Sequence, residues 1–261
     1  MTATTTAAPS PTVLTTAQFH AAVHTALSGP GPRIAVFDCD GTLWSGDAGS
    51  GFMRWTIGEG VGAQRILSAD AIARLDARYQ GYLAGQVSEL AICGEMVQIY
   101  AGLRESDMRA AAAEYFATQV ESNIFPEMLV LIRDLQASGT EIWAVSSTCD
   151  WVVEEGVRRF SIPADHVLAA RVAIDSDGLV TRTLLDVPTD EGKVAALARA
   201  GITAPDAVFG NSIHDAAMLS IARSRNGIAG PFPVNPSPEL LARAAAESWP
   251  VFYPASVAPS P

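Results

Sequence analysis

The chain has 261 residues, of which 49% are hydrophobic and 17% charged, so it can bury one large core, with or without an inserted module. Its formal net charge of −11 argues against nucleic acid and anionic membranes as partners. No apolar run approaches the roughly 18 residues that a transmembrane helix requires. The three cysteines, Cys39, Cys93 and Cys149, lack a metal-binding spacing and are typical of reduced thiols inside a cell.

Residues 1–14 are rich in Thr, Ala and Pro, and they lack the basic and apolar regions of a signal peptide. They predict a disordered tail, and we expect a cytoplasmic protein that is a monomer or a homodimer. A helix is expected over residues 15–27, followed by a buried strand over 34–37.

The segment 46–120 has helical periodicity throughout, and no strand is expected in it. Helices are predicted over residues 69–85, 88–103 and 105–120. Because this block interrupts the chain directly after the first strand, it is predicted to be a helical cap domain. The core domain would then comprise residues 15–45 and 121–261.

Strands and helices alternate after residue 120. Strands are expected at 141–145, 166–175, 178–185, 206–210 and 226–230, and helices at 127–139, 150–160, 190–201, 214–222 and 238–248. The second and third of these strands flank a Ser-Asp-Gly turn and predict a hairpin. The alternation predicts an α/β fold, a doubly wound, Rossmann-like parallel sheet with an inserted α-helical cap domain, whose ligands bind at the carboxyl ends of the strands.

Polar side chains follow three of the predicted strands at once, and the only lysine opens the helix before the third. The set comprises Asp38 and Asp40, Ser146 and Ser147, Asn211 and Asp215, and Lys193. The acidic and amide oxygens suit Mg²⁺, which would offset the repulsion between neighbouring carboxylates. The hydroxyl of Ser146, the backbone N–H of Ser147 and the ammonium of Lys193 supply donors for an anion. A metal, anion donors and a carboxylate nucleophile together indicate phosphoryl transfer.

The four motifs DCDGTLW, VSST, EGK and GNSIHDAAML resemble, in order, the signature motifs of the haloacid dehalogenase-like phosphohydrolase superfamily. The spacing and the helical insert resemble its phosphoserine phosphatase-like branch with a C1-type cap. The resemblance covers about residues 33–230. It implies a Rossmann-like core and Mg²⁺-dependent hydrolysis of phosphate esters.

The resemblance also implies a role for each matching residue. Asp38 would be the nucleophile that forms an aspartyl-phosphate, and Asp40 would protonate the leaving alcohol and then activate water. Ser146 would bind the transferring phosphoryl group, and Lys193 would neutralise its charge. The metal would be held by Asp38, the backbone carbonyl of Asp40 and Asn211, with Asp215 binding the ion directly or supporting its ligands.

The fourth motif departs from the usual pattern, which more often begins Gly-Asp. Asn211 offers a carbonyl oxygen without a charge, so we expect weaker Mg²⁺ binding, partly compensated by Asp215.

The substrate pocket is less constrained. Asp47 stands where phosphoserine phosphatases carry the glutamate that receives the substrate's amine. A gapless match places Glu95 near their cap arginine, for which Arg54 or Arg104 could substitute. If Glu95 faces the site, it forms with Asp47 an anionic pocket that favours a cationic or hydroxyl-rich leaving group. The alternative is that Glu95 is a solvated helix charge.

Gly41, Thr42 and Ser147 complete the expected substrate-binding residues, and Trp44, Trp55 and Tyr100 are candidates to line the pocket. His214 is interpreted as a helix-start residue in preference to a general acid. The predicted function is a Mg²⁺-dependent phosphatase for a small phosphomonoester, such as phosphoserine or a phospho-amino-alcohol. The alternatives are a phosphotransferase or mutase on the same site, and a catalytically silent binding protein of the same fold.

Overall fold

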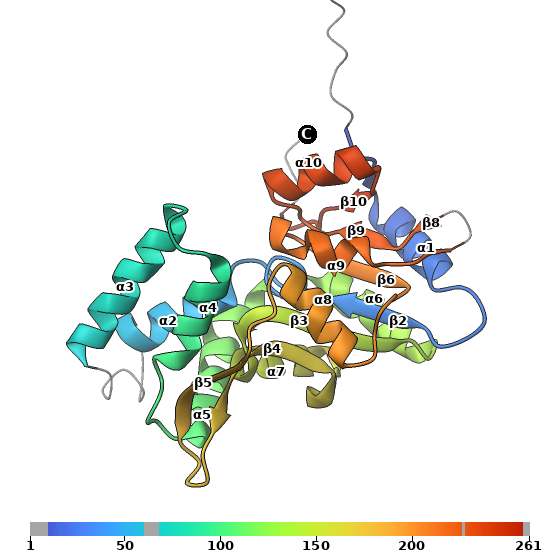
Figure 1. The fold of residues 1–261 in the computed structure, drawn as a ribbon. Helices are drawn as coiled ribbons and strands as arrows, with labels where there is room; N and C mark the ends of the chain where they lie inside the picture. Colours follow the sequence, from blue (N-terminus) through green and yellow to red (C-terminus); the bar gives the residue numbers. More distant parts are fainter. Residues whose placement is uncertain (1–9, 60–67, 226–227, 258–261) are drawn as a thin grey trace, which may run out of the picture.

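A computed structural model describes residues 10–59, 68–225 and 228–257 (Figure 1). Its helices are α1 (Thr16–Ala26), α2 (Ala48–Arg54), α3 (Ala69–Leu83), α4 (Glu89–Gln98), α5 (Glu105–Tyr115), α6 (Pro126–Ala137), α7 (Asp150–Val157), α8 (Glu191–Arg199), α9 (Ala216–Ser220) and α10 (Pro238–Glu247). Its strands are β1 (Val13–Leu14), β2 (Ile34–Phe37), β3 (Glu141–Cys149), β4 (Val167–Ile174), β5 (Val180–Asp186), β6 (Ala207–Gly210), β7 (Ser224–Arg225), β8 (Ile228–Ala229), β9 (Pro231–Pro233) and β10 (Val251–Phe252).

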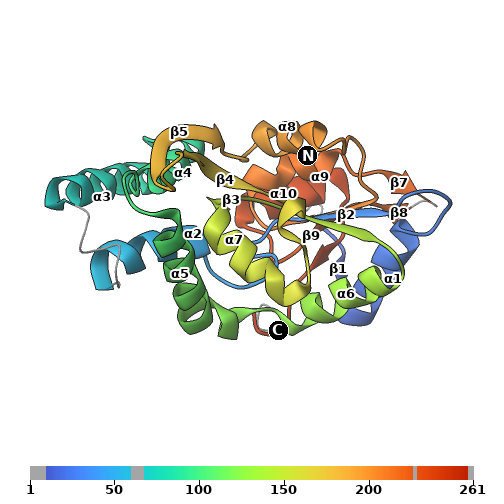
Figure 2. The same cartoon turned by 90° about the horizontal axis from the view of Figure 1, so that it is seen from below.

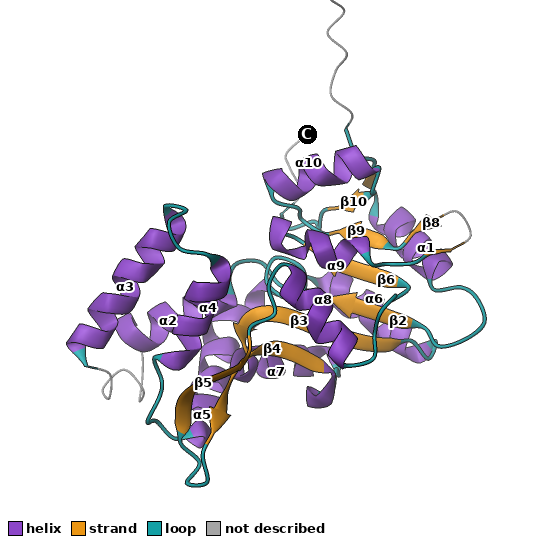
Figure 3. Ribbon diagram, in the orientation of Figure 1, coloured by secondary structure: helices purple, strands orange, loops and turns teal. Residues whose placement is uncertain are grey.

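The central sheet has six strands in the order β5-β4-β3-β2-β6-β9 (Figure 3). All neighbours are parallel except β4 and β5, which form the expected antiparallel hairpin. Strand β2 lies at the middle, where Val36 is in register with Trp143 of β3 and Val208 of β6. The doubly wound α/β fold expected from the sequence is confirmed.

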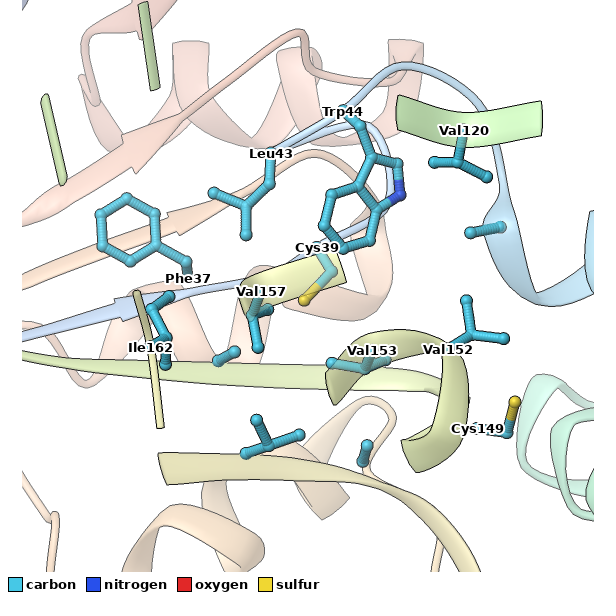
Figure 4. Packing of buried hydrophobic residues seen from close by; sticks show 14 of the residues in the cluster. Phe37, Cys39, Leu43, Trp44, Val120, Cys149, Val152, Val153, Val157 and Ile162 are labelled. Atoms are coloured by element: carbon cyan, nitrogen blue, oxygen red, sulfur yellow. The ribbon is translucent and has the colours of Figure 1, made fainter. Parts of the chain in front are cut away.

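Helices cover both faces of this sheet, with α1, α6 and α7 on one side and α8 and α9 on the other (Figure 2). The central strands are apolar on both faces for this reason. Phe37 points to the larger core, where its ring stacks on Phe209 at 4.1 Å, and Val36 belongs to the smaller cluster on the opposite face. Figure 4 shows the larger core, where Trp44 and Val153 lie in one cluster with Phe37.

Helices α2, α3, α4 and α5 are inserted between β2 and α6, and they lie beside the core sheet (Figures 1 and 2). We call them the cap helices. They are the helical block expected at 46–120, and β2 and β3 point their carboxyl ends toward them. The division into separate cap and core domains stays a prediction.

Three expectations need correction. Residues 1–9 lie outside the described part of the chain, but Val13–Leu14, predicted to be disordered, pair in parallel with Val251–Phe252. Strand β3 continues past Val145 to Cys149, with a register shift that ends its regular pairing. The strand expected at 226–230 falls partly on residues 226–227, outside the described residues, and Ile228–Ala229 form β8, which pairs with β7 in a separate two-stranded sheet. The edge strand of the central sheet is instead Pro231–Pro233, at a position that tolerates prolines, which lack an N–H.

No helix in the described ranges is long and apolar enough to cross a membrane. The three cysteines are buried and unpaired, as expected of small core residues.

Candidate active site

Asp38 lies directly after β2, and its carboxylate is held from two sides. Its Oδ1 accepts a hydrogen bond from Nζ of Lys193 at 2.8 Å, and its Oδ2 accepts one from Oγ1 of Thr42 at 3.0 Å. Burial raises the pKa of Asp38 to about 7, as does the nearby charge of Asp215, while Lys193 opposes the rise. Two oxygens fixed by two donors give this carboxylate one orientation toward the cavity.

Lys193 is buried between two carboxylates, because its Nζ also donates to Oδ1 of Asp215 at 2.5 Å and to the carbonyl of Val145 at 3.3 Å. Burial lowers the pKa of Lys193, but the charges of Asp215 and Asp38 outweigh it and hold the pKa above its usual value. The side chain is therefore an ammonium placed beside Asp38.

Asp40 is fixed by three donors from two parts of the chain. Its Oδ1 accepts from the indole of Trp44 at 2.6 Å and from the backbone N–H of Ala48 at 2.9 Å, and its Oδ2 accepts from Oγ1 of Thr148 at 2.7 Å. Burial raises the pKa of Asp40 to about 6, the charge of Asp47 adds to the rise, and the three hydrogen bonds oppose it. A carboxyl with this pKa can exchange a proton near neutral pH.

Asp215 supports the loop after β6. Its Oδ2 accepts from the backbone N–H groups of Asn211 and Ser212, both at 2.9 Å, and its Oδ1 is taken by Lys193. Both oxygens are thus engaged and the side chain is wholly buried, and whether it binds the metal directly or supports its ligands stays a prediction.

The loops after β2 and β6 meet at Gly41. A Cβ there would lie 1.9 Å from Nδ2 of Asn211, so only glycine lets the two loops approach. This brings the Asn211 amide beside the loop that carries the Asp38 carboxylate and the Asp40 carbonyl, an all-oxygen donor set that fits Mg²⁺. In the part of the chain that the structure describes, no three His, Cys, Asp or Glu side chains form a group that could hold a metal ion.

These groups border a cavity of about 210 Å³ between the sheet and the cap helices. Its walls are formed by Asp38, Asp40, Gly46, Asp47, Tyr79, Tyr82, Glu89, Ile92, Cys93, Met96, Ser146, Ser147, Thr148, Lys193, Asn211, Ser212 and His214. The structure thus brings together the catalytic residues expected from the sequence, along with Asp47, Ser147 and Asn211. No arginine lines the cavity within the described residues.

Other expected residues lie elsewhere. Glu95 does not line the cavity; its carboxylate pairs with the guanidinium of Arg78 of α3 at 2.8 Å. Thr42 is buried and binds Asp38 instead of facing the cavity, and Gly41 serves the loop contact. Trp44 and Tyr100 are buried behind the walls.

The face of α4 that lines the cavity was not predicted from the sequence. Its four lining residues are at positions i, i+3, i+4 and i+7 of the helix. Glu89, Ile92, Cys93 and Met96 share one face of the helix, and Glu95 lies about 120° away from Glu89. The two tyrosines of α3, Tyr79 and Tyr82, were also missed. The helical period of α4 was the available signal for Glu89.

The sequence is similar to those of known proteins. A family model described as haloacid dehalogenase-like hydrolase matches residues 35–220. A histidinol-phosphatase from Neisseria meningitidis serogroup C (strain 8013) is 24% identical over 228 residues, which cover 84% of this chain and 97% of that protein.

Solved structures share the fold. A protein of unknown function from Bordetella pertussis Tohama I has a TM-score of 0.69 at 22% identity, over 85% of this chain and 99% of the other. A substrate-bound phosphoserine phosphatase has a TM-score of 0.56 at 15% identity, over 86% of this chain and 94% of the other. Because the family match spans most of the sequence and includes every strand-end residue named above, the chain belongs to the haloacid dehalogenase-like hydrolase family.

Proposed function

We propose that the protein is a phosphatase, which hydrolyses a small phosphomonoester in two steps through an aspartyl-phosphate on Asp38. The observation that carries the proposal is the placement of Asp38 between Lys193 and Thr42 at the wall of the cavity, with the carboxyl of Asp40 on the same wall. The nucleophile, the charge that balances the phosphoryl group and the proton donor thus border one space.

In the first step an oxygen of Asp38 attacks phosphorus, the bond from phosphorus to the alcohol oxygen breaks, and Asp40 gives its proton to that oxygen. In the second step Asp40 takes a proton from water, whose oxygen attacks phosphorus and releases phosphate from Asp38. Ser146 and Lys193 stabilise the phosphoryl oxygens in both steps. Mg²⁺, held by Asp38, the Asp40 carbonyl and Asn211, would neutralise the charge of the phosphate group when bound.

A panel of small phosphomonoesters, assayed with Mg²⁺ and with EDTA, tests the chemistry. We expect metal-dependent phosphate release that Asp38→Asn abolishes and that Asp40→Asn lowers by about 10²–10⁴-fold. An added acceptor alcohol separates hydrolysis from transfer, because a transferase would release less phosphate and form a new ester. Full activity of Asp38→Asn would refute the nucleophile.

For the substrate, we propose a phospho-amino-alcohol that carries no carboxylate. Asp47 offers a carboxylate to an ammonium, and Tyr79 and Tyr82 offer aromatic faces. A substrate carboxylate would need a cation, and the described lining residues offer only Lys193 and His214, both already paired with carboxylates. The similarity to a histidinol-phosphatase supports the same class, because histidinol phosphate is such a molecule.

The matched test compares L-histidinol phosphate with phosphoserine. We expect kcat/KM to be at least about tenfold higher for the first, a difference of about 1.4 kcal/mol. Asp47→Asn keeps the cap that Oδ1 of Asp47 provides to the N–H of Ser50 and removes only the charge. It should lower kcat/KM for the amine substrate clearly more than for p-nitrophenyl phosphate, which has no amine, because any effect of Asp47 on the pKa of Asp40 is shared by both esters. An equal effect on both esters would contradict an amine subsite at Asp47.

A further inference from the structure

Glu89, the first residue of α4, is contacted by polar side chains from four other segments of the chain. Its Oε1 accepts from Oγ of Ser147 at 3.1 Å and Oγ1 of Thr189 at 3.0 Å. Its Oε2 accepts from the hydroxyl of Tyr82 at 3.2 Å and forms an ion pair with Nε2 of His214 at 2.7 Å. Each oxygen of a carboxylate has two lone pairs, so all the acceptor positions of Glu89 are filled by the protein itself.

The ring of His214 lies between Glu89 of the cap helix α4 and Asp190 of the core. Its Nδ1 lies 2.8 Å from Oδ1 of Asp190, and its Nε2 faces Glu89. An ionised carboxylate only accepts hydrogen bonds, so both ring nitrogens must donate and the ring carries a positive charge. Such a ring has no free nitrogen to act as a general base, and it forms a charged bridge between a cap helix and the core.

Asp190 has an unusual backbone, with φ 50° and ψ −129°. Ser161 and Ser248 also have positive φ, but their ψ of 31° places them in the ordinary left-handed region. The carbonyl of Asp190 accepts from the N–H of Lys193 at 3.1 Å. The bridge therefore ends at a strained residue of the turn that presents Lys193 to Asp38.

We propose that Glu89 is a positioning residue that, through His214 and Asp190, holds helix α4 on the core and fixes the turn that carries Lys193. Thr189, in the same turn, is bound to Glu89 directly, so two contacts reach this turn from the cap. The inference concerns the arrangement of the site, and its kinetic part rests on the proposed phosphatase function.

Hydrogen exchange without substrate tests the positioning role independently of activity. Glu89→Gln and His214→Gln should raise the exchange rate of backbone amides in residues 187–193 and at the start of α4 by about tenfold. Glu105→Gln is the matched control: Glu105 is likewise the first residue of a cap helix and is ion-paired, with Arg109 at 2.8 Å, but does not line the cavity. Unchanged exchange in Glu89→Gln, or an equal rise in Glu105→Gln, would overturn the proposal.

Steady-state kinetics test the consequence for Lys193. Glu89→Gln and His214→Gln should each lower kcat about tenfold with KM changed less than threefold, and the double variant should be no slower than the slower single variant. Independent effects that multiply to about 100-fold, or an unchanged kcat, would count against the connection. If Glu89→Gln fails to fold, Thr189→Val replaces it in the test, because it removes one of the four donors around Glu89. We expect kcat of Thr189→Val to fall about threefold.

The two proposals fail in different ways. If the wild-type protein releases no phosphate from any ester, the proposed function fails, and the exchange rates still decide the role of Glu89. If the wild type is active and the exchange rates of the variants match it, only the positioning role fails.

Discussion

Gly41 has a backbone φ of +72°, and the Asn211 side chain occupies the space where its Cβ would lie. Gly41→Ala therefore meets two obstacles, a left-handed backbone and a contact at 1.9 Å. We expect it to lower the free energy of unfolding by about 1–3 kcal/mol and kcat by at least about tenfold, because the two loops of the site must separate. Thermal unfolding measures the change in stability, and phosphate release measures the change in kcat. A variant with wild-type stability and wild-type kcat would contradict the close approach of the two loops.

Asn211 offers an amide oxygen where a carboxylate would add charge. Asn211→Asp should tighten Mg²⁺ binding about tenfold, or about 1.4 kcal/mol, because the added negative charge attracts the cation. Without metal the same variant should unfold at a lower temperature, since the new carboxylate would line the same cavity as Asp38 and Asp40 and repel them. Isothermal titration with Mg²⁺ measures the affinity, and thermal unfolding in EDTA measures the melting temperature without metal. Equal affinity would show that Asn211 does not contact the ion.

At the scale of the element, Asp150 opens helix α7, and its Oδ1 accepts from the N–H of Trp151. Burial raises the pKa of Asp150 to about 6, and Glu154 adds to the rise. Between about pH 4 and pH 6, therefore, Asp150 is protonated in the native state but ionised in the unfolded chain, where its pKa is about 3.9. The contribution of Asp150 to stability is therefore present below pH 4 and is lost as pH rises toward 6.

Asp150→Asn keeps the acceptor and removes the charge. Relative to the wild type, it should be about 1–3 kcal/mol more stable at pH 8 and nearly equal at pH 4. Urea unfolding at the two pH values measures the difference. A gain of the same size at pH 4 would show that the effect does not come from ionisation.

The predictability of the site follows from its placement on strand ends. Asp38 and Asn211 each follow a strand of continuous apolar residues, and Ser146 follows the apolar run of residues 142–145 within β3. Because parallel strands point their carboxyl ends to one edge of the sheet, these residues are expected to converge there. Lys193 was predicted because it opens a helix within the same alternation. The core site could thus be predicted from local patterns.

The cap side could not be predicted in the same way, because it depends on the rotation of α4. Glu89 and Glu95 lie six residues apart, about 120° around the helix, and both occupy a helix with acidic and apolar residues. A gapless alignment that ignored the helical period made Glu95 a candidate for the cavity, with a solvated helix charge as the alternative, whereas the structure places Glu89 there. Strand β1 was missed for another reason: two residues that pair with Val251–Phe252 carry almost no local pattern.

At the scale of the whole molecule, Phe19 of α1 connects the two ends of the chain to the sheet. Its ring stacks on Phe252 of β10 at 4.2 Å and meets Phe209 and Phe232 edge-on at 6.0 Å. Phe19→Ala should lower the free energy of unfolding by about 3–5 kcal/mol, or the melting temperature by about 10 °C. Phe19→Leu should lose less, and both should keep the wild-type kcat at 25 °C, since Phe19 does not border the cavity. A large loss of kcat with an unchanged melting temperature would contradict a purely structural role.

The buried position of Lys193 has a practical consequence for the whole molecule. The chain has one lysine, and that side chain is 2% exposed, so the folded surface offers no lysine amine to chemical or enzymatic modification. Succinimidyl dyes, lysine-directed crosslinkers and acyl- or ubiquitin-transferring enzymes would reach it only when the pocket opens. The rate at which such a reagent labels Lys193 therefore measures how often the active site opens, and the measurement needs no variant of the protein.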